Sequence, residues 1–289
     1  MIPAPFDYRR AATLEEAVAL LQEHGEEAKL LSGGHSLLPI LKARLARPAL
    51  LIDIGRIPGL SGISREEGAL RIGALTTHRE IEASPLVREA CPLLAEAAER
   101  IGDVQVRNRG TIGGSLAHAD PAADYPAAAL ALEAEVSATG PKGARTIPAE
   151  KFFTGPLETA LGPTEILASL RVPLPRARSG GVYLKAAQQA SGFAVCGVAA
   201  LLTLAPNGTV ASARVGVTGV AAPAYRAKGV EETLAGKSLS AENIKAAAAR
   251  AAEGVAPLDD FYASAEFRAH LARVYTERAL KEAARRAGA

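Results

Sequence analysis

The 289-residue sequence has little sulfur and few aromatic side chains: two cysteines, one methionine, no tryptophan and 4% aromatic residues. Cys91 and Cys196 lie far apart and form no Cys-x-x-Cys pair, which argues against an iron–sulfur or zinc site within the chain. Because aromatic residues are scarce, the core must consist mainly of alanine, leucine, valine and isoleucine.

A strong charge of one sign and a long apolar run are also missing. The formal net charge of +2 gives no reason to expect a nucleic acid partner. The N-terminal stretch MIPAPFDYRR lacks the apolar segment of a signal peptide, and the longest apolar run, FAVCGVAALLTLA, is too short to span a bilayer. We therefore expect a cytoplasmic protein without a transmembrane segment, with free and buried thiols.

Capping residues and hydrophobic periodicity predict mixed α and β structure in the first half. Thr13-x-x-Glu16 has the form of a capping box and starts the helical stretch LEEAVALLQEH. The runs AKLLSGG and ALLIDIG read as short strands of a β-α-β-like start. A second capping box begins at Thr77, and Ser84-Pro85 starts one further helix over PLVREACPLLAEAAERI.

The composition changes near LPRARSGG at residues 174–181, which we take as a domain boundary. Asn207-Gly208 joins two β-prone runs, as in a hairpin. The stretches SAENIKAAAARAAEGV and SAEFRAHLARVYTERALKEAARRA then read as helices, the second with Phe267 among its apolar residues. The second half is therefore expected to combine an antiparallel sheet with helices.

Two Gly-Gly loops carry the strongest functional signal. They are SGGHS at residues 32–36 and TIGGS at residues 111–115, each flanked by hydroxyl side chains. Glycine lets a backbone approach a ligand closely, and successive N–H groups in such a turn bind anions. Two such loops could clamp a diphosphate from both sides, although two ordinary tight turns would look the same. Neither loop has the Rossmann or P-loop pattern, so only a non-Rossmann nucleotide site stays open.

Isolated polar residues near these loops are weaker candidates. His35 lies within the first loop, where a single histidine is more often a packing or hydrogen-bonding residue than a catalyst. His78 begins a helix and is expected at the surface or in an interface. His118 and Asp120 are too few for a metal site. Asp124 precedes an alanine-rich helix and suits the positive end of its dipole. We therefore predict no catalytic residue and no metal ligand.

The same residues resemble a known family. The stretches KLLSGGHSLLPILKARLARPALLIDI, IGALTTHREIE, QVRNRGTIGGSLAHADPAADYPAAALAL and YLKAAQQASGFAVCGVAALL are similar to the medium, FAD-binding subunits of molybdenum hydroxylases. Medium subunits of aerobic carbon monoxide dehydrogenase are the nearest kin, and the FAD domain of xanthine dehydrogenase is more distant. The resemblance covers essentially the whole chain, and the two Gly-Gly motifs in this order are highly specific.

The resemblance implies an α+β fold of the vanillyl-alcohol-oxidase type. In that fold, two α/β subdomains hold FAD between them, and a C-terminal domain with an antiparallel sheet and helices packs against the second. We expect the subdomains at residues 1–55 and 56–176 and the C-terminal domain at residues 177–289.

The resemblance also implies which residues bind FAD, without covalent attachment. The first loop would wrap the pyrophosphate and ribityl chain with Leu30, Leu31, Ser32, Gly33, Gly34, His35, Ser36 and Leu37. The second would close on the pyrophosphate with Thr111, Ile112, Gly113, Gly114 and Ser115. Ile101 would pack near the adenine, Asp124 would bind the adenosine part, Leu167 would line the flavin, and Lys185 would lie near the isoalloxazine.

One segment departs from the family pattern. Relatives often read Gly-Asp-Phe-Ala where this chain has Ser191-Gly192-Phe193-Ala194. The acid expected there is absent, so either another group takes over its task beside Lys185 or the flavin potential differs.

The implied function is that of an FAD-carrying electron-transfer subunit in a heterotrimeric molybdenum hydroxylase. A large subunit would carry the molybdenum cofactor, a small subunit would carry [2Fe-2S] clusters, and an external acceptor would receive the electrons. The complex would be a dimer of heterotrimers, peripheral at most to the inner membrane face. A self-contained FAD-dependent oxidase or reductase is the alternative, and a flavin-free binding module is a third reading. Neither the substrate nor the acceptor follows from this chain.

Overall fold

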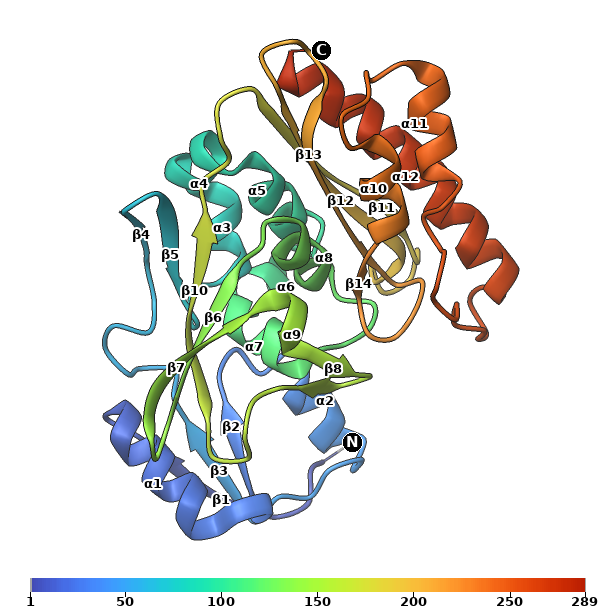
Figure 1. The fold of residues 1–289 in the computed structure, drawn as a ribbon. Coiled ribbons are helices and arrows are strands. Elements are labelled where there is room, and N and C mark those ends of the chain that lie inside the picture. Colours follow the sequence, from blue (N-terminus) through green and yellow to red (C-terminus); the bar gives the residue numbers. More distant parts are fainter. Residues whose placement is uncertain (1, 289) are drawn as a thin grey trace.

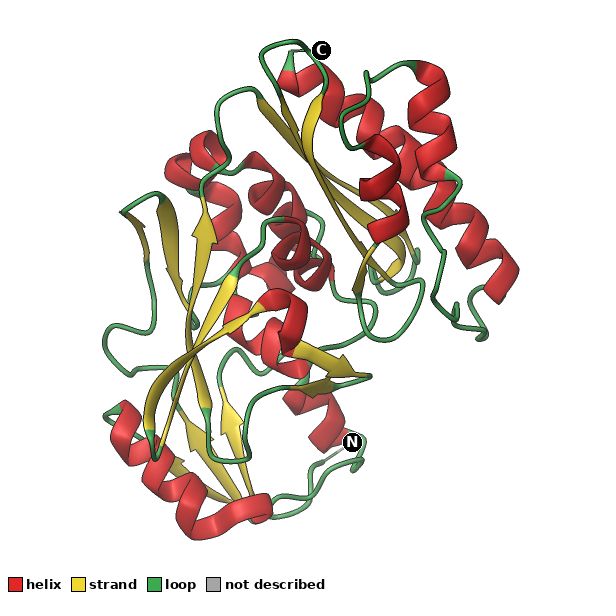
Figure 2. Ribbon diagram, viewed as in Figure 1, coloured by secondary structure: helices red, strands yellow, loops and turns green. Residues whose placement is uncertain are grey.

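The computed structural model describes residues 2–288. Three parts follow one another along the chain: the blue N-terminal part, the teal and green middle part, and the orange and red C-terminal part (Figure 1). A parallel sheet, separate antiparallel sheets and helices packed around them (Figure 2) confirm the predicted α+β class.

The N-terminal part is a three-stranded parallel sheet in the order β1-β3-β2. Its elements are β1 (Asp7–Arg10), α1 (Leu14–His24), the 3-10 turn η1 (Gly25–Glu27), β2 (Ala28–Leu31), α2 (Leu37–Lys42) and β3 (Leu50–Asp53). The predicted first helix is confirmed, and the Thr13 hydroxyl accepts the Glu16 N–H at 3.2 Å. Because β2 runs parallel to β3 and ends at Leu31, the first Gly-Gly loop leaves the carboxyl edge of this sheet.

The middle part contains an antiparallel sheet in the order β4-β5-β10-β6-β7, with a helical layer beside it. Its strands are β4 (Ile63–Glu66), β5 (Ala69–Gly73), β6 (Glu135–Gly140), β7 (Gly143–Pro148) and β10 (Ile166–Pro173). Its helices are α3 (His78–Ala83), α4 (Pro85–Ala90), α5 (Pro92–Glu99), α6 (Val104–Arg107), α7 (Ile112–His118), α8 (Asp124–Ala131) and α9 (Ala149–Phe152). A short hairpin of β8 (Phe153–Gly155) and β9 (Glu158–Thr159) follows α9.

The single helix expected over residues 85–101 is wrong. Cys91 leaves the helical conformation, with φ −150° and ψ 66°, and Pro92 opens α5 as a new helix. Proline has no N–H to donate and its ring clashes with the carbonyl four residues earlier, so it ends α4 and starts α5. The break lets α5 turn toward the C-terminal part, where Glu96 accepts the Tyr183 N–H at 2.9 Å.

The C-terminal part is an antiparallel sheet in the order β11-β12-β13-β14, covered by three helices. Its elements are β11 (Ser179–Ala187), β12 (Ala194–Leu204), β13 (Val210–Thr218), β14 (Tyr225–Arg226), α10 (Lys228–Leu234), α11 (Ala241–Ala248) and α12 (Ala265–Ala287). The predicted Asn207-Gly208 hairpin is confirmed, whereas α11 is shorter than the expected helix.

Strand β12 joins the middle and C-terminal parts because its side chains alternate between two cores. Val198 and Ala200 pack with α12, whereas Ala199 packs with α5 and α8. The sheet therefore lies between two helical layers, which ties the C-terminal part to the helices that lead into the candidate site.

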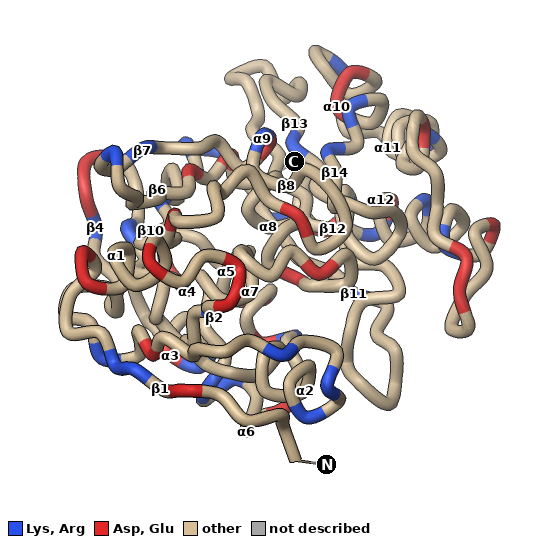
Figure 3. The backbone as a smooth tube through the Cα atoms, turned by 90° about the horizontal axis from the view of Figure 1, so that it is seen from below, with Lys and Arg blue, Asp and Glu red and all other residues tan. Residues whose placement is uncertain are grey.

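Charged residues of both signs nearly balance in number, which gives the small net charge, and they are spread over the chain. Seen from below, several Lys and Arg residues follow β1 and α2 along the N-terminal part (Figure 3). Among residues 2–288, no helix is both long enough and apolar enough to cross a membrane.

Candidate functional site

A cavity of about 560 Å³ lies where the N-terminal part, the start of α7, the start of α8 and the segment 191–193 meet. Its volume is typical of a cofactor or small-molecule site. Of the residues proposed from the sequence, it is lined by Leu30, Ser32, Gly33, Gly34, His35, Ser36, Leu37, Ile101, Thr111, Gly113, Gly114, Ser115, Asp124 and Leu167. The fold therefore brings most of the cofactor-binding residues proposed from the sequence together around one cavity.

Three proposed residues do not line the cavity. Ile112 is fully buried in the core of the middle part, because the first turn of α7 directs its side chain away from the loop. Leu31 is the last residue of β2 and packs under Gly34. Lys185 reaches the site only through Asp124.

The first loop presents unused backbone donors to the cavity. Within residues 2–288, the N–H groups from Gly33 to Leu37 donate no hydrogen bond to another protein group. Gly34 has φ +79°, a left-handed conformation that glycine adopts without strain. Consecutive free N–H groups around such a residue form a concavity with a positive potential. The loop can therefore bind an anion through its backbone.

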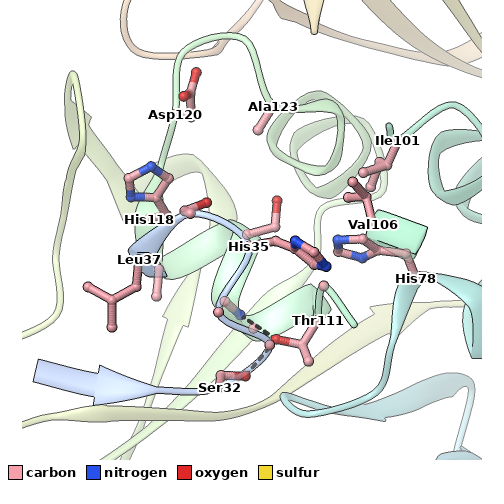
Figure 4. A pocket seen from close by; sticks show the side chains of 18 of the residues that line it. Ser32, His35, Leu37, His78, Ile101, Val106, Thr111, His118, Asp120 and Ala123 are labelled. Atoms are coloured by element: carbon pink, nitrogen blue, oxygen red, sulfur yellow. Dashed lines mark hydrogen bonds between the residues drawn. The ribbon is translucent and has the colours of Figure 1, made fainter. Parts of the chain in front are cut away.

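The second loop uses its backbone differently. The Ile112 and Gly113 N–H groups already donate to the carbonyls of Thr76 and Ala74, at 3.0 and 2.9 Å. The Thr111 hydroxyl caps α7 by accepting the Gly114 N–H at 3.2 Å (Figure 4). This loop therefore offers the cavity hydroxyl groups and a close backbone surface.

A direct hydrogen bond joins the two loops. Ser32 Oγ lies 2.8 Å from Thr111 Oγ1 (Figure 4). Gly33 packs so tightly on the second segment that an added Cβ would lie 2.1 Å from the Arg109 carbonyl oxygen. At Gly114 an added Cβ would meet only Thr111 Oγ1, at 2.8 Å, before it reaches Ser32 Oγ at 3.8 Å. Gly33 thus serves packing, while Gly114 leaves room in the cavity itself.

A buried polar cluster closes the end of the cavity next to the C-terminal part. Asp124 accepts the Tyr183 hydroxyl at 2.6 Å and pairs with Lys185 Nζ at 2.8 Å, and the Asp124 and Lys185 side chains are only 4% and 2% exposed. Lys185 also donates to the Arg100 carbonyl at 2.8 Å. Burial raises the pKa of Asp124 to about 6, against the opposing effects of Lys185 and Tyr183.

This cluster bears on the positions that the resemblance implies for three residues. Asp124 and Ile101 were expected at the adenosine of FAD and Lys185 at the isoalloxazine, which are opposite ends of the cofactor. The ion pair places Asp124 and Lys185 together, and Ile101 follows Arg100, whose carbonyl binds the same lysine. Ile101 and Asp124 line the cavity and Lys185 lies directly behind Asp124, while the roles expected for these residues toward FAD stay predictions. Asp124 also supplies Lys185 with the anion that the segment 191–194 lacks.

The segment Ser191-Gly192-Phe193 lines this same end. Gly192 has φ +74°, and an added Cβ would lie 3.5 Å from the Gly102 Cα. The Phe193 side chain remains 47% exposed. The resemblance singled out these residues only for a missing acid, whereas the structure makes them part of the cavity wall.

His78 is the main residue that sequence reasoning placed wrongly. It was expected at the surface or in an interface, but it is only 4% exposed within the chain and lines the cavity beside His35 (Figure 4). It is the first residue of α3, and its N–H donates to the Gly110 carbonyl at 2.9 Å. Its helical position carried no signal of burial, because the burial comes from the segment around Gly110, about thirty residues further along the chain. His118 and Asp120 line the cavity, but residues 2–288 contain no group of three potential metal ligands.

Comparison with protein families agrees with this geometry. The model of the FAD binding domain in molybdopterin dehydrogenase matches residues 4–175, and that of the CO dehydrogenase flavoprotein C-terminal domain matches residues 181–283. The chain belongs to this FAD-binding family. Its members are subunits of molybdenum hydroxylases, which are oxidoreductases, and in them the molybdenum cofactor is carried by other subunits.

Individual family members are similar over their full length. The carbon monoxide dehydrogenase medium chain of Hydrogenophaga pseudoflava is 43% identical over 98% of both chains. The glyceraldehyde dehydrogenase medium chain of Sulfolobus acidocaldarius is 34% identical over 98% of this chain and all of its own. A structure of carbon monoxide dehydrogenase from Hydrogenophaga pseudoflava superposes with a TM-score of 0.96, at 44% identity and 99% coverage of both chains. This match confirms the fold class that the resemblance implied.

The residues present fit FAD, the cofactor of the family. The free N–H groups of Gly33 to Leu37 suit a diphosphate, and Gly114 leaves space that a side chain would occupy. Apolar Leu37, Ile101 and Leu167 line the walls, as a site for aromatic rings requires.

Proposed function

We propose that this chain is the FAD-carrying electron-transfer subunit of a heterotrimeric molybdenum hydroxylase. When bound, FAD supplies one- and two-electron transfer between the [2Fe-2S] clusters of a small subunit and an external acceptor. A large subunit would hold the molybdenum cofactor and the substrate. The observation that supports this most is the cavity between the two Gly-Gly loops, in a chain whose relatives are medium chains over their full length.

The cavity geometry suggests how the chain holds its cofactor. Backbone N–H groups of Gly33 to Leu37 would bind the diphosphate, while Thr111 and Gly114 shape the opposite wall. Ile101, Asp124 and Phe193 would hold the isoalloxazine, since Lys185, which the resemblance implies near that ring, pairs with Asp124 there. In this arrangement Asp124 serves the flavin end and not the adenosine. Residues 1–55 and 56–176 form the two walls, and residues 177–289 close the flavin end.

Exposed aromatic side chains support a role within a larger assembly. Phe261 is 99% exposed and Tyr262 is 62% exposed, and their rings pack edge to face with centroids 5.8 Å apart. Aromatic residues are enriched at protein interfaces, so this pair is a candidate contact with a partner subunit.

Purification and reconstitution test the proposed function. The chain is expected to bind one FAD that acid precipitation releases into the supernatant, because no residue stands out as a covalent attachment site. Expressed alone, it is expected to show no oxidation of aldehydes, purines or carbon monoxide with a dye acceptor. A chain that binds no flavin, or one that turns over such substrates unaided, would contradict the proposal. Capture of the tagged chain with its large and small partners would support it.

A further inference from the structure

The imidazole rings of two histidines in the cavity wall have no stated role in the proposed arrangement, which uses only the backbone of His35. His35 comes from the first loop and His78 from the first turn of α3, and their rings point toward one another (Figure 4). His78 is 4% exposed, and its Nδ1 has no hydrogen-bond partner within residues 2–288. An added Cβ at Gly110 would lie 2.5 Å from His78 Nε2, so the absence of a side chain there admits the ring.

The charged groups around His78 leave it without a counter-ion. Arg107 pairs with Glu82 at 2.9 Å, and Arg79 pairs with the same carboxylate at 3.2 Å. Tyr125 packs against the His78 ring with centroids 5.2 Å apart, and its neighbour Asp124 is engaged by Lys185. Burial, followed by the positive charges of His35 and Arg107, lowers the pKa of His78 to about 4. The cavity wall at this point therefore favours a negative ligand and disfavours a second cation.

We propose that His35 and His78 bind the diphosphate of the cofactor together, and that His78 takes up one proton from solvent when the diphosphate binds. This inference rests on the proposed function, because His35 stands among the free N–H groups assigned to the diphosphate. A buried imidazolium is unfavourable unless an anion compensates it, and two phosphate charges provide that anion. No bond of the cofactor forms or breaks, and the proton is the only species transferred.

The sign of the pH dependence follows from this coupling. A diphosphate raises the pKa of His78 from its low value in the free chain, so the bound form holds the additional proton. Affinity for FAD must then decrease as pH rises from the low pKa of the free chain to the pKa of the bound form, and level off above it. We expect FAD to bind at least about tenfold more weakly at pH 8 than at pH 5.5, a difference of about 1.4 kcal/mol.

Calorimetry of the FAD-free chain tests the inference directly. FAD is titrated at one pH into buffers of different ionisation enthalpy, and the dependence of the measured heat on the buffer counts the protons taken up. The wild-type chain should take up more than half a proton at pH 6. His78→Asn should take up almost none, and His270→Asn, which changes an exposed histidine on α12, should behave like the wild type.

Each outcome distinguishes this inference from the proposed function. Failure of the wild-type chain to bind FAD at any pH contradicts the proposed function. FAD binding without proton uptake, at an affinity independent of pH, overturns the inference alone. Uptake that survives in His78→Asn but disappears in Asp124→Asn would assign the proton to Asp124, and also overturns it. Thermal melting shows whether His78→Asn folds, and if it does not, His35→Asn should still reduce the uptake and weaken the pH dependence.

Discussion

The two Gly-Gly loops look alike in the sequence but use their backbones in opposite ways. Both carry two glycines between hydroxyl residues, and both line the same cavity. From Gly33 to Leu37 the N–H groups are free, whereas Ile112 and Gly113 donate theirs to Thr76 and Ala74. The first loop is therefore a turn whose free N–H groups can bind an anion, and the second is a helix start fixed to a neighbouring strand end.

The glycines differ in the same way. Gly33 and Gly113 are needed because other backbone lies against them: the Arg109 carbonyl at one and Ala74 at the other. Gly114 faces the cavity, where the nearest atoms to an added Cβ are side-chain oxygens. A glycine packed against backbone and a glycine that faces the cavity can thus stand one residue apart.

The largest effect is expected for Gly33→Ala. Its new Cβ would lie 2.1 Å from a backbone oxygen, so the two segments must separate. Overpacking of this kind typically costs 1–3 kcal/mol, and a contact with rigid backbone should reach about 3 kcal/mol or more. Urea denaturation of the FAD-free chain measures the loss of unfolding free energy.

The matched control is Gly114→Ala, which adds the same methyl group to the second loop. It meets only the Thr111 hydroxyl and restores helix propensity, so its unfolding free energy should change by less than about 1 kcal/mol. Equal destabilisation by the two variants would show that both glycines serve packing, and the comparison would fail.

The second effect concerns ligand affinity. Gly114→Val would extend a branched side chain from the α7 start into the cavity, toward the space between Thr111 and Ser32. We expect FAD binding to weaken by at least about 3 kcal/mol, which is roughly a hundredfold or more. Fluorescence titration of flavin into the FAD-free protein measures this change, alongside its melting temperature.

Asp124→Asn, at the other end of the cavity, is the comparison for the loss of FAD affinity expected in Gly114→Val. The amide keeps an acceptor but loses the charge, so FAD binding should weaken by only about 1 to 2 kcal/mol. If Gly114→Val folds and binds FAD like the parent protein, the second loop does not border the diphosphate.

The smallest effect is expected where the loops touch. Ser32→Ala removes the hydroxyl that bonds to Thr111 at 2.8 Å but leaves every backbone contact in place. The loss of unfolding free energy should be about 1 kcal/mol. Thr111→Ala should lower the unfolding free energy by about 1 kcal/mol more than Ser32→Ala does, because it also removes the hydroxyl that accepts the Gly114 N–H. The opposite order in urea denaturation would mean that the cap contributes less than the contact between the loops.

Local signals predicted much of the chain correctly. Thr13 and Thr77 cap helices as their spacing indicates, and Asn207-Gly208 turns the long hairpin. The prediction of one continuous helix over residues 85–101 failed because Pro92 ends the helix that the hydrophobic periodicity would continue. Prediction from local signals also failed where burial comes from a distant segment, as at His78. A helix-start position is equally compatible with a surface residue and with a residue covered by another loop.

Residue types and short-range spacing alone determined the glycine loops, their flanking hydroxyls, the capped helices and the family resemblance, because these depend on backbone chemistry over a few residues. Tertiary structure decided which loop keeps its N–H groups free. It also paired Asp124 with Lys185 and set His78 beside His35. These features depend on contacts between segments far apart in the chain: 61 residues separate Lys185 from Asp124, to which it donates a hydrogen bond. Only the packing of sheets and helices determines which distant side chains meet and which charges lose water.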